Sequence, residues 1–104
     1  MVEPDRISVV IDQDLESILP GYLANRQKDL LQITKDLQTG DFVSLQTMGH
    51  RMKGSGTGYG LNEVSKIGQE MEEAAKAHDG EQISKLAAEL TTYLQCIDIV
   101  YKEL

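Results

Sequence analysis

The chain contains few of the residues that mark disulfide-stabilised, membrane-spanning or nucleic-acid-binding proteins. It has a single cysteine, Cys96, which excludes a disulfide within the chain and is expected to act as a small buried apolar residue. No apolar run approaches the roughly 20 residues of a membrane span, and the N-terminal residues lack the pattern of a signal peptide. A formal net charge of −7 argues against binding to nucleic acid or to an anionic membrane surface. We therefore expect a cytoplasmic protein that binds neither of them.

Proline and aromatic residues are also scarce, and the residues that remain favour helices. The 104 residues include two prolines, no tryptophan and one phenylalanine, whereas 40% are apolar and 26% are charged. Leu, Glu, Lys, Gln, Ala and Met are abundant, and all of them have high helix propensity. A chain of this length and composition is expected to form one all-α domain.

Apolar residues recur at helical spacing in four segments of the chain. The first segment contains Pro20, so its helix either begins near that residue or is kinked there. Gly40 is a candidate C-cap for this helix, and Asp41 is a candidate N-cap for the next one. The last segment shows the cleanest period, and its helix is expected to continue through Val100 and Tyr101. Short turns join the segments, so neighbouring helices are expected to run in opposite directions.

These segments predict an antiparallel up-down four-helix bundle. The bundle domain is expected to span residues 12–104. Residues 1–11 precede it as a short leader, whose β-branched run predicts a strand or an extended arm that packs on the bundle.

One short stretch of the second expected helix carries the chemistry. His50, Lys53 and Gly54 share a helix face, because residues three and four apart are neighbours. At about 100° per residue, His50 lies roughly 140° from the centre of the apolar face, so its ring is expected to be exposed. Lys53 supplies a cation that can pair with a phosphoryl oxygen, and Gly54 leaves the approach to the imidazole clear. Gly49 points toward the core and is expected to permit close helix packing.

Other polar residues near His50 have weaker claims to a role. Gln46 and Thr57 lie on or near its face, so a bound group or partner could reach them. Ser55 either donates a hydrogen bond to a phosphate or caps the helix end. The three glutamates between residues 70 and 73 are interpreted as a solvated helix face.

Three other kinds of site are not supported by the spacing. In a nucleotide-binding loop the lysine follows the glycines and a strand precedes them, whereas Lys53 comes before the glycines of residues 54–60. His50, His78 and Cys96 show none of the usual metal-ligand spacings. No serine or cysteine has an identifiable base and orienting acid for nucleophilic hydrolysis. We expect neither a cofactor nor a metal.

The stretch around His50 resembles the histidine-containing phosphotransfer (Hpt) domains of phosphorelays. The matching residues run from His50 to Ser55, followed by Gly60 and by Met71-Glu72, and the resemblance covers about residues 12–102. It implies that His50 is the phosphoacceptor, through Nε2. By the same resemblance Lys53 balances the phosphate charge and Gly54 keeps the approach open.

The resemblance also implies what the protein works with. The expected function is to carry a phosphoryl group between the aspartates of response-regulator receiver domains, and a hybrid histidine kinase is a further candidate partner. Mg²⁺ is expected on the receiver domain. Since the sequence has no ATP-binding element, we expect a phosphoryl carrier and not an enzyme. Gly54, Gln46, Ser55 and Thr57 are the candidate binding residues.

Two other functions stay open. A helical adaptor that is never phosphorylated would dock a receiver or a histidine kinase through the same face. A phosphatase-like or catalytic helper of a histidine kinase would need a second polar residue beside His50, for which Gln46 is the candidate.

Overall fold

The helices of the protein begin and end at residues whose chemistry favours a helix terminus. In the computed structural model, Pro20 lies in the first turn of the first helix, where its missing N–H is not needed. Gly40 ends that helix in the left-handed conformation, with φ of 69°. Asp41 and Asp79 then cap the next helix and the last one by accepting hydrogen bonds from backbone N–H groups. The first helix therefore begins near Pro20, and both expected caps at residues 40 and 41 are confirmed.

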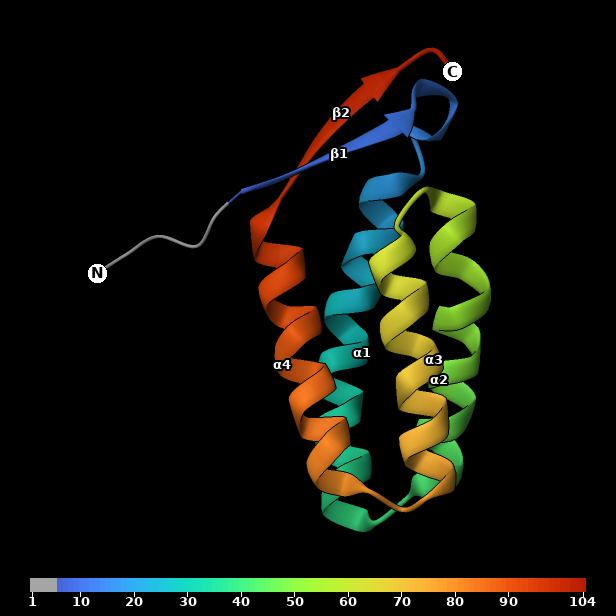
Figure 1. The fold of residues 1–104 in the computed structure, drawn as a ribbon, viewed down its shortest axis with the longest axis vertical. Coiled ribbons are helices and arrows are strands. Elements are labelled where there is room, and N and C mark those ends of the chain that lie inside the picture. The colour runs from blue at the N-terminus through green and yellow to red at the C-terminus, as the bar shows by residue number, and fades with distance from the viewer. Residues whose placement is uncertain (1–5) are drawn as a thin grey trace, which may run out of the picture.

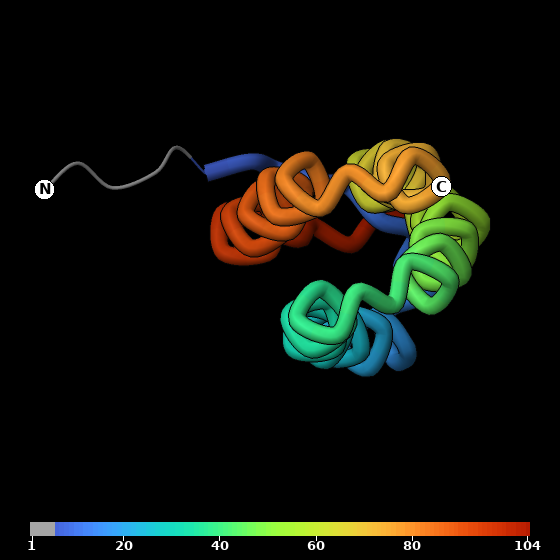
Figure 2. The backbone as a smooth tube through the Cα atoms, turned by 90° about the horizontal axis from the view of Figure 1, so that it is seen from below, coloured from blue at the N-terminus to red at the C-terminus, as the bar shows by residue number. Residues whose placement is uncertain are grey.

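The structure describes residues 6–104 as four α-helices and two short strands (Figure 1), with two 3₁₀ turns at Gln13–Leu15 and Thr57–Tyr59. Figure 2 shows the helices end on, in the order α1, α2, α3, α4 around the bundle. Chain neighbours run in opposite directions, so the expected four-helix bundle is confirmed. Within the described range, none of the helices combines the length and apolarity that crossing a membrane requires. The elements are β1 (Ile7–Asp12), α1 (Leu19–Thr39), α2 (Phe42–Gly56), α3 (Asn62–Lys76), α4 (Gly80–Cys96) and β2 (Ile97–Lys102).

The two strands correct the prediction that the fourth helix continues through Val100 and Tyr101. Helix α4 ends at Cys96, and the chain continues as β2, which pairs in parallel with β1 from Ile7↔Ile97 onward. The apolar residues of this stretch match a helical period, but alternate residues are half-buried and exposed, as in a strand. Pairing with the N-terminal strand therefore decides the conformation, and the helical prediction was wrong here.

The expected leader is, where it is described, the strand β1. It continues through Asp12, and Ile11 is only 1% exposed, so the strand contributes to the core. The first five residues of the leader lie outside the described part of the chain. Both strands lie across the end of the bundle where the helix α1 begins (Figure 1).

Candidate functional site

His50 lies in the middle of α2 with a largely exposed ring. Its side chain is 71% exposed, as the helical azimuth predicted. The core-facing side of the same helix is formed by buried residues, among them Leu45 and Met52. A group on another protein can therefore reach the imidazole without any rearrangement of the bundle.

Glu72 of α3 holds the imidazole from one side. His50 Nδ1 lies 2.8 Å from Glu72 Oε2, and Lys53 Nζ lies 3.7 Å from the other carboxylate oxygen. An ionised carboxylate only accepts hydrogen bonds, so Nδ1 carries the proton and donates it. Nε2 is then the ring nitrogen that has no hydrogen-bond partner among the described residues. The sequence predicted that Glu72 lies on a solvated helix face, and that prediction was wrong, because its side chain is only 13% exposed.

The charges around Glu72 keep it ionised. Burial pushes the pKa of its carboxyl upward, but the His50 hydrogen bond and the nearby charges of His50, Lys76 and Lys53 outweigh burial. The pKa of Glu72 therefore lies below its ordinary value. At neutral pH this carboxylate is a stable acceptor for the Nδ1 proton and can stabilise a positive charge on the ring.

Two glycines bring α2 and α3 close enough for this contact. A Cβ added at Gly49 would lie 2.6 Å from the Glu72 backbone nitrogen, and one added at Gly68 would lie 2.7 Å from the Gly49 carbonyl oxygen. Side chains at these positions would separate the helices. The expected packing role of Gly49 is thus confirmed, whereas its partner Gly68 was missed. A glycine inside the third helical segment was the only available signal.

Gly54 is open, in contrast to these two. A Cβ added there meets nothing within 4 Å, and the residue is exposed one turn after His50. Lys53 is exposed beside it, while Gln46 is half-buried one turn before the histidine. The structure therefore brings His50, Lys53 and Gly54 together on one accessible face of α2, with Gln46 at its border.

Ser55 and Thr57 are tied to other elements of the bundle. The Ser55 hydroxyl lies 2.7 Å from the hydroxyl of Tyr22 in α1. Thr57 donates its backbone N–H to the hydroxyl of Ser65 in α3, at 2.8 Å. These contacts give both residues a structural task at the end of α2, and their proposed part in binding a partner stays a prediction.

Comparison with known proteins identifies a family. The model of the Hpt domain family matches residues 17–97, a range that contains all four helices. Comparison with curated protein sequences gives no match, and comparison with solved structures gives none. His50, Lys53, Gly54 and Glu72 lie within the matched range, whereas β1 lies outside it.

Proposed function

The chain belongs to the Hpt domain family, and on this premise we propose that it carries a phosphoryl group on His50 between the aspartates of receiver domains. Hpt domains act in phosphorelay histidine phosphotransfer in two-component signalling, where they interact with receiver domains and histidine kinases. The observation that carries the proposal is the exposed imidazole whose Nδ1 is held by Glu72, 2.8 Å away. We expect the exchange to take place in the cytoplasm.

The transfer step follows from the state of the ring. The Nε2 lone pair of neutral His50 attacks the phosphorus of a receiver aspartyl phosphate; an N–P bond forms, and the bond from phosphorus to the aspartate oxygen breaks. The ring becomes positively charged, and the Glu72 carboxylate stabilises that charge through the Nδ1 proton. The return step reverses these changes, since the charged ring is a good leaving group. Glu72 is a positioning residue in this scheme.

Lys53 and Gly54 are proposed to stabilise the phosphoryl charge and to leave room for the receiver, respectively. Phosphoryl transfer requires mainly positioning and charge stabilisation, so a carrier can rely on Mg²⁺ and on the acceptor pocket of the receiver. Lys53, whose ammonium lies 3.7 Å from Glu72, is near enough to His50 to pair with a phosphoryl oxygen. Gly54 leaves space for the receiver surface. The protein is in this view a carrier without a kinase activity of its own.

The decisive experiment is transfer from a receiver domain phosphorylated with labelled phosphate. Acid-labile, base-stable label is expected on the wild type and is expected to be absent from His50→Gln. His78→Gln is the matched control, because it removes the other histidine of the chain and should leave labelling unchanged. Label retained by His50→Gln would refute the assignment. Receiver binding undiminished in His50→Ala, with no label on any form, would favour the adaptor instead.

A further inference from the structure

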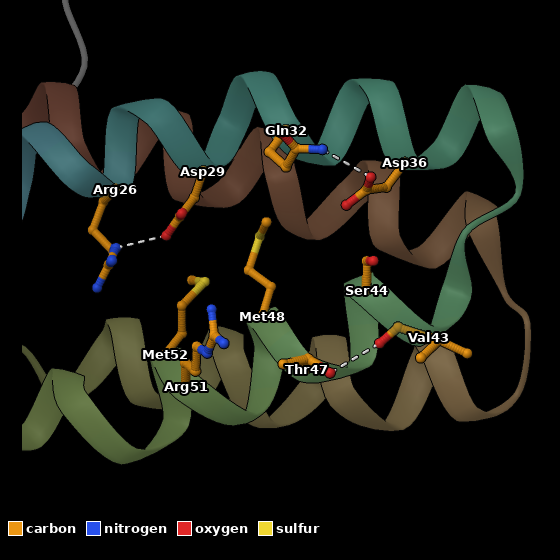
Figure 3. A pocket seen from close by; sticks show the side chains of 10 residues that line it. All are labelled: Arg26, Asp29, Gln32, Asp36, Val43, Ser44, Thr47, Met48, Arg51 and Met52. Atoms are coloured by element: carbon orange, nitrogen blue, oxygen red, sulfur yellow. Dashed lines mark hydrogen bonds and ion pairs between the residues drawn. The ribbon is translucent and has the colours of Figure 1, made fainter.

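A pocket of about 380 Å³ lies between α1 and α2, on a different side of α2 from His50. Figure 3 shows side chains of both helices converging on it. Its volume is within the range of small-molecule sites in proteins. The transfer chemistry described above uses none of its polar groups.

The end of the pocket near Asp36 has an unsatisfied acceptor. Asp36 is only 5% exposed, and its Oδ1 accepts a hydrogen bond from Gln32 at 2.9 Å. Its Oδ2 has no hydrogen-bond partner among the described residues. In Figure 3 one oxygen faces Gln32 on the same helix, and the other lies in the space between α1 and α2. Burying a carboxylate without a counter-charge costs free energy. A cation that donates a hydrogen bond to Oδ2 would reduce that cost.

Neither arginine that lines the pocket lies beside Asp36 in Figure 3. Arg26 Nε lies 2.8 Å from Asp29 Oδ2, and its guanidinium stacks over the Tyr22 ring at 4.3 Å. Burial raises the pKa of Asp29, although Arg26 and Arg51 act against it. Figure 3 places Arg26 and Asp29 at the opposite end of the pocket from Asp36. The positive charge of Arg26 is thus paired with Asp29, and Figure 3 shows Arg51 on the same side of Met48 as that pair, so neither cation contacts Asp36.

Further acceptors and an apolar surface complete the site. The Ser44 hydroxyl donates to Asp41 at 2.7 Å and the Thr47 hydroxyl donates to the Val43 carbonyl at 3.1 Å, so the lone pairs of both oxygens stay available. Met48 lies between the two ends of the pocket and offers an apolar surface (Figure 3).

We propose that this pocket binds a small aliphatic amine, with its ammonium group at Asp36 and its hydrocarbon chain along Met48. An ammonium has three donors, which can bind the free Asp36 oxygen and the hydroxyl oxygen of Ser44, the residue that faces Asp36 across the pocket in Figure 3. Gln32, whose side-chain amide donates to the other Asp36 oxygen, is exposed beside the carboxylate. The proposal rests on the unpaired Asp36 oxygen and on the shape of the pocket, and it does not depend on the role of His50.

The test is a titration of the ¹⁵N-labelled protein with 1-pentylamine, followed by amide chemical shifts. Saturable shifts are expected at Ser44, Thr47 and Met48, and 1-pentanol, the neutral probe of the same length, should not produce them. Asp36→Asn keeps the shape of the side chain and should weaken binding at least tenfold. Glu89→Gln removes one negative charge from α4, outside the pocket, and should leave the affinity unchanged.

Two results would overturn the proposal. One is the absence of saturable shifts. The other is a set of shifts that spreads over the acidic surface and is the same in wild type and Asp36→Asn, because a net charge of −7 attracts cations without a site. If Asp36→Asn does not fold, Thr47→Phe fills the pocket from an exposed position and should abolish the same shifts. Binding undiminished in that variant would also refute the site.

Discussion

Helix α2 contacts its two neighbours in opposite ways. Toward α3 the backbones meet at Gly49 and Gly68, where no side chain intervenes. Toward α1 the helices are separated by longer side chains, among them Met48, Arg51 and Asp36, which surround a pocket of about 380 Å³. Close packing leaves few alternative arrangements, so the α2–α3 contact fixes the geometry around the histidine. The same helix can thus hold a reactive side chain rigidly and still border a cavity.

The largest test of this contrast is Gly68→Ala. The new Cβ would lie 2.7 Å from the Gly49 carbonyl oxygen and 2.7 Å from Met52 Cβ, and it would also meet the Lys53 backbone nitrogen. Because these atoms are mostly backbone, the helices must move apart. We expect the free energy of unfolding to fall by about 2 kcal/mol, measured by urea denaturation.

Gly21→Ala is the matched control for this change. Gly21 lies in α1, and a Cβ there meets nothing within 4 Å, so the helix propensity of alanine should maintain or slightly raise stability. If Gly68→Ala were as stable as Gly21→Ala, the α2–α3 contact would have room for an added methyl group. The packing on the α3 side of α2 would then be no closer than the packing on the α1 side.

Glu72→Ala tests the function of the close contact. Without the carboxylate, Nδ1 loses the acceptor that orients the ring and stabilises its positive charge. We expect the rate of phosphotransfer from a labelled receiver to fall about tenfold. Glu72→Gln keeps an acceptor oxygen and should recover part of the rate, which a purely structural role would not explain. The exposed neighbour Glu73 provides the control variant Glu73→Ala, with an unchanged rate.

The pH dependence of the free energy of unfolding should also depend on the contact between His50 and Glu72. The folded protein holds the pKa of Glu72 below its ordinary value of 4.5, so the folded state binds this proton less readily than the unfolded chain does. The stabilisation is therefore fully present above pH 4.5 and is lost as the pH falls through the lowered pKa. Comparison of unfolding curves for wild type and Glu72→Gln should show a gap in the free energy of unfolding that shrinks as the pH falls below 4.5. A gap independent of pH would mean that the charge of Glu72 contributes nothing.

The same difference in packing shows what the sequence could and could not predict. Helix ends depend on local chemistry, so Gly40 and Asp41 were identified correctly. The conformation of Ile97–Lys102 depends on a strand at the other end of the chain, and a local pattern of apolar residues does not contain that information.

The residues of the candidate site also differ in whether the sequence could predict them. The outward direction of His50 follows from the period of its own helix, and the sequence was sufficient for it. The contact with Glu72 requires the rotation of α3 relative to α2, which Gly49 and Gly68 determine together. A helical period gives the azimuth of a residue on its own helix but not the partner on the next one, so Glu72 was misinterpreted.

A smaller test addresses the α1–α2 side. The Tyr22 hydroxyl lies 2.7 Å from Ser55, and the Tyr22 ring stacks on Tyr59 with centroids 4.0 Å apart. Tyr22→Phe keeps the stack and removes the hydrogen bond, which should lower the free energy of unfolding by about 1 kcal/mol in thermal or urea denaturation. Tyr101→Phe, at a hydroxyl with no hydrogen-bond partner in residues 6–104, is the control. Equal stabilities would show that this hydrogen bond does not help to join α1 to α2.

Gly54→Ala tests the part of α2 that faces neither neighbour. A Cβ there meets nothing within 4 Å, and alanine favours the helix, so the free energy of unfolding should rise by about 0.5 kcal/mol. Phosphotransfer should slow at the same time, because the methyl group occupies space that the receiver needs beside His50. Gly58→Ala, also open but beyond the end of α2, should leave the rate unchanged. A variant that is more stable and equally fast would show that this glycine serves neither packing nor access, and that the reactive face of α2 tolerates side chains as its pocket face does.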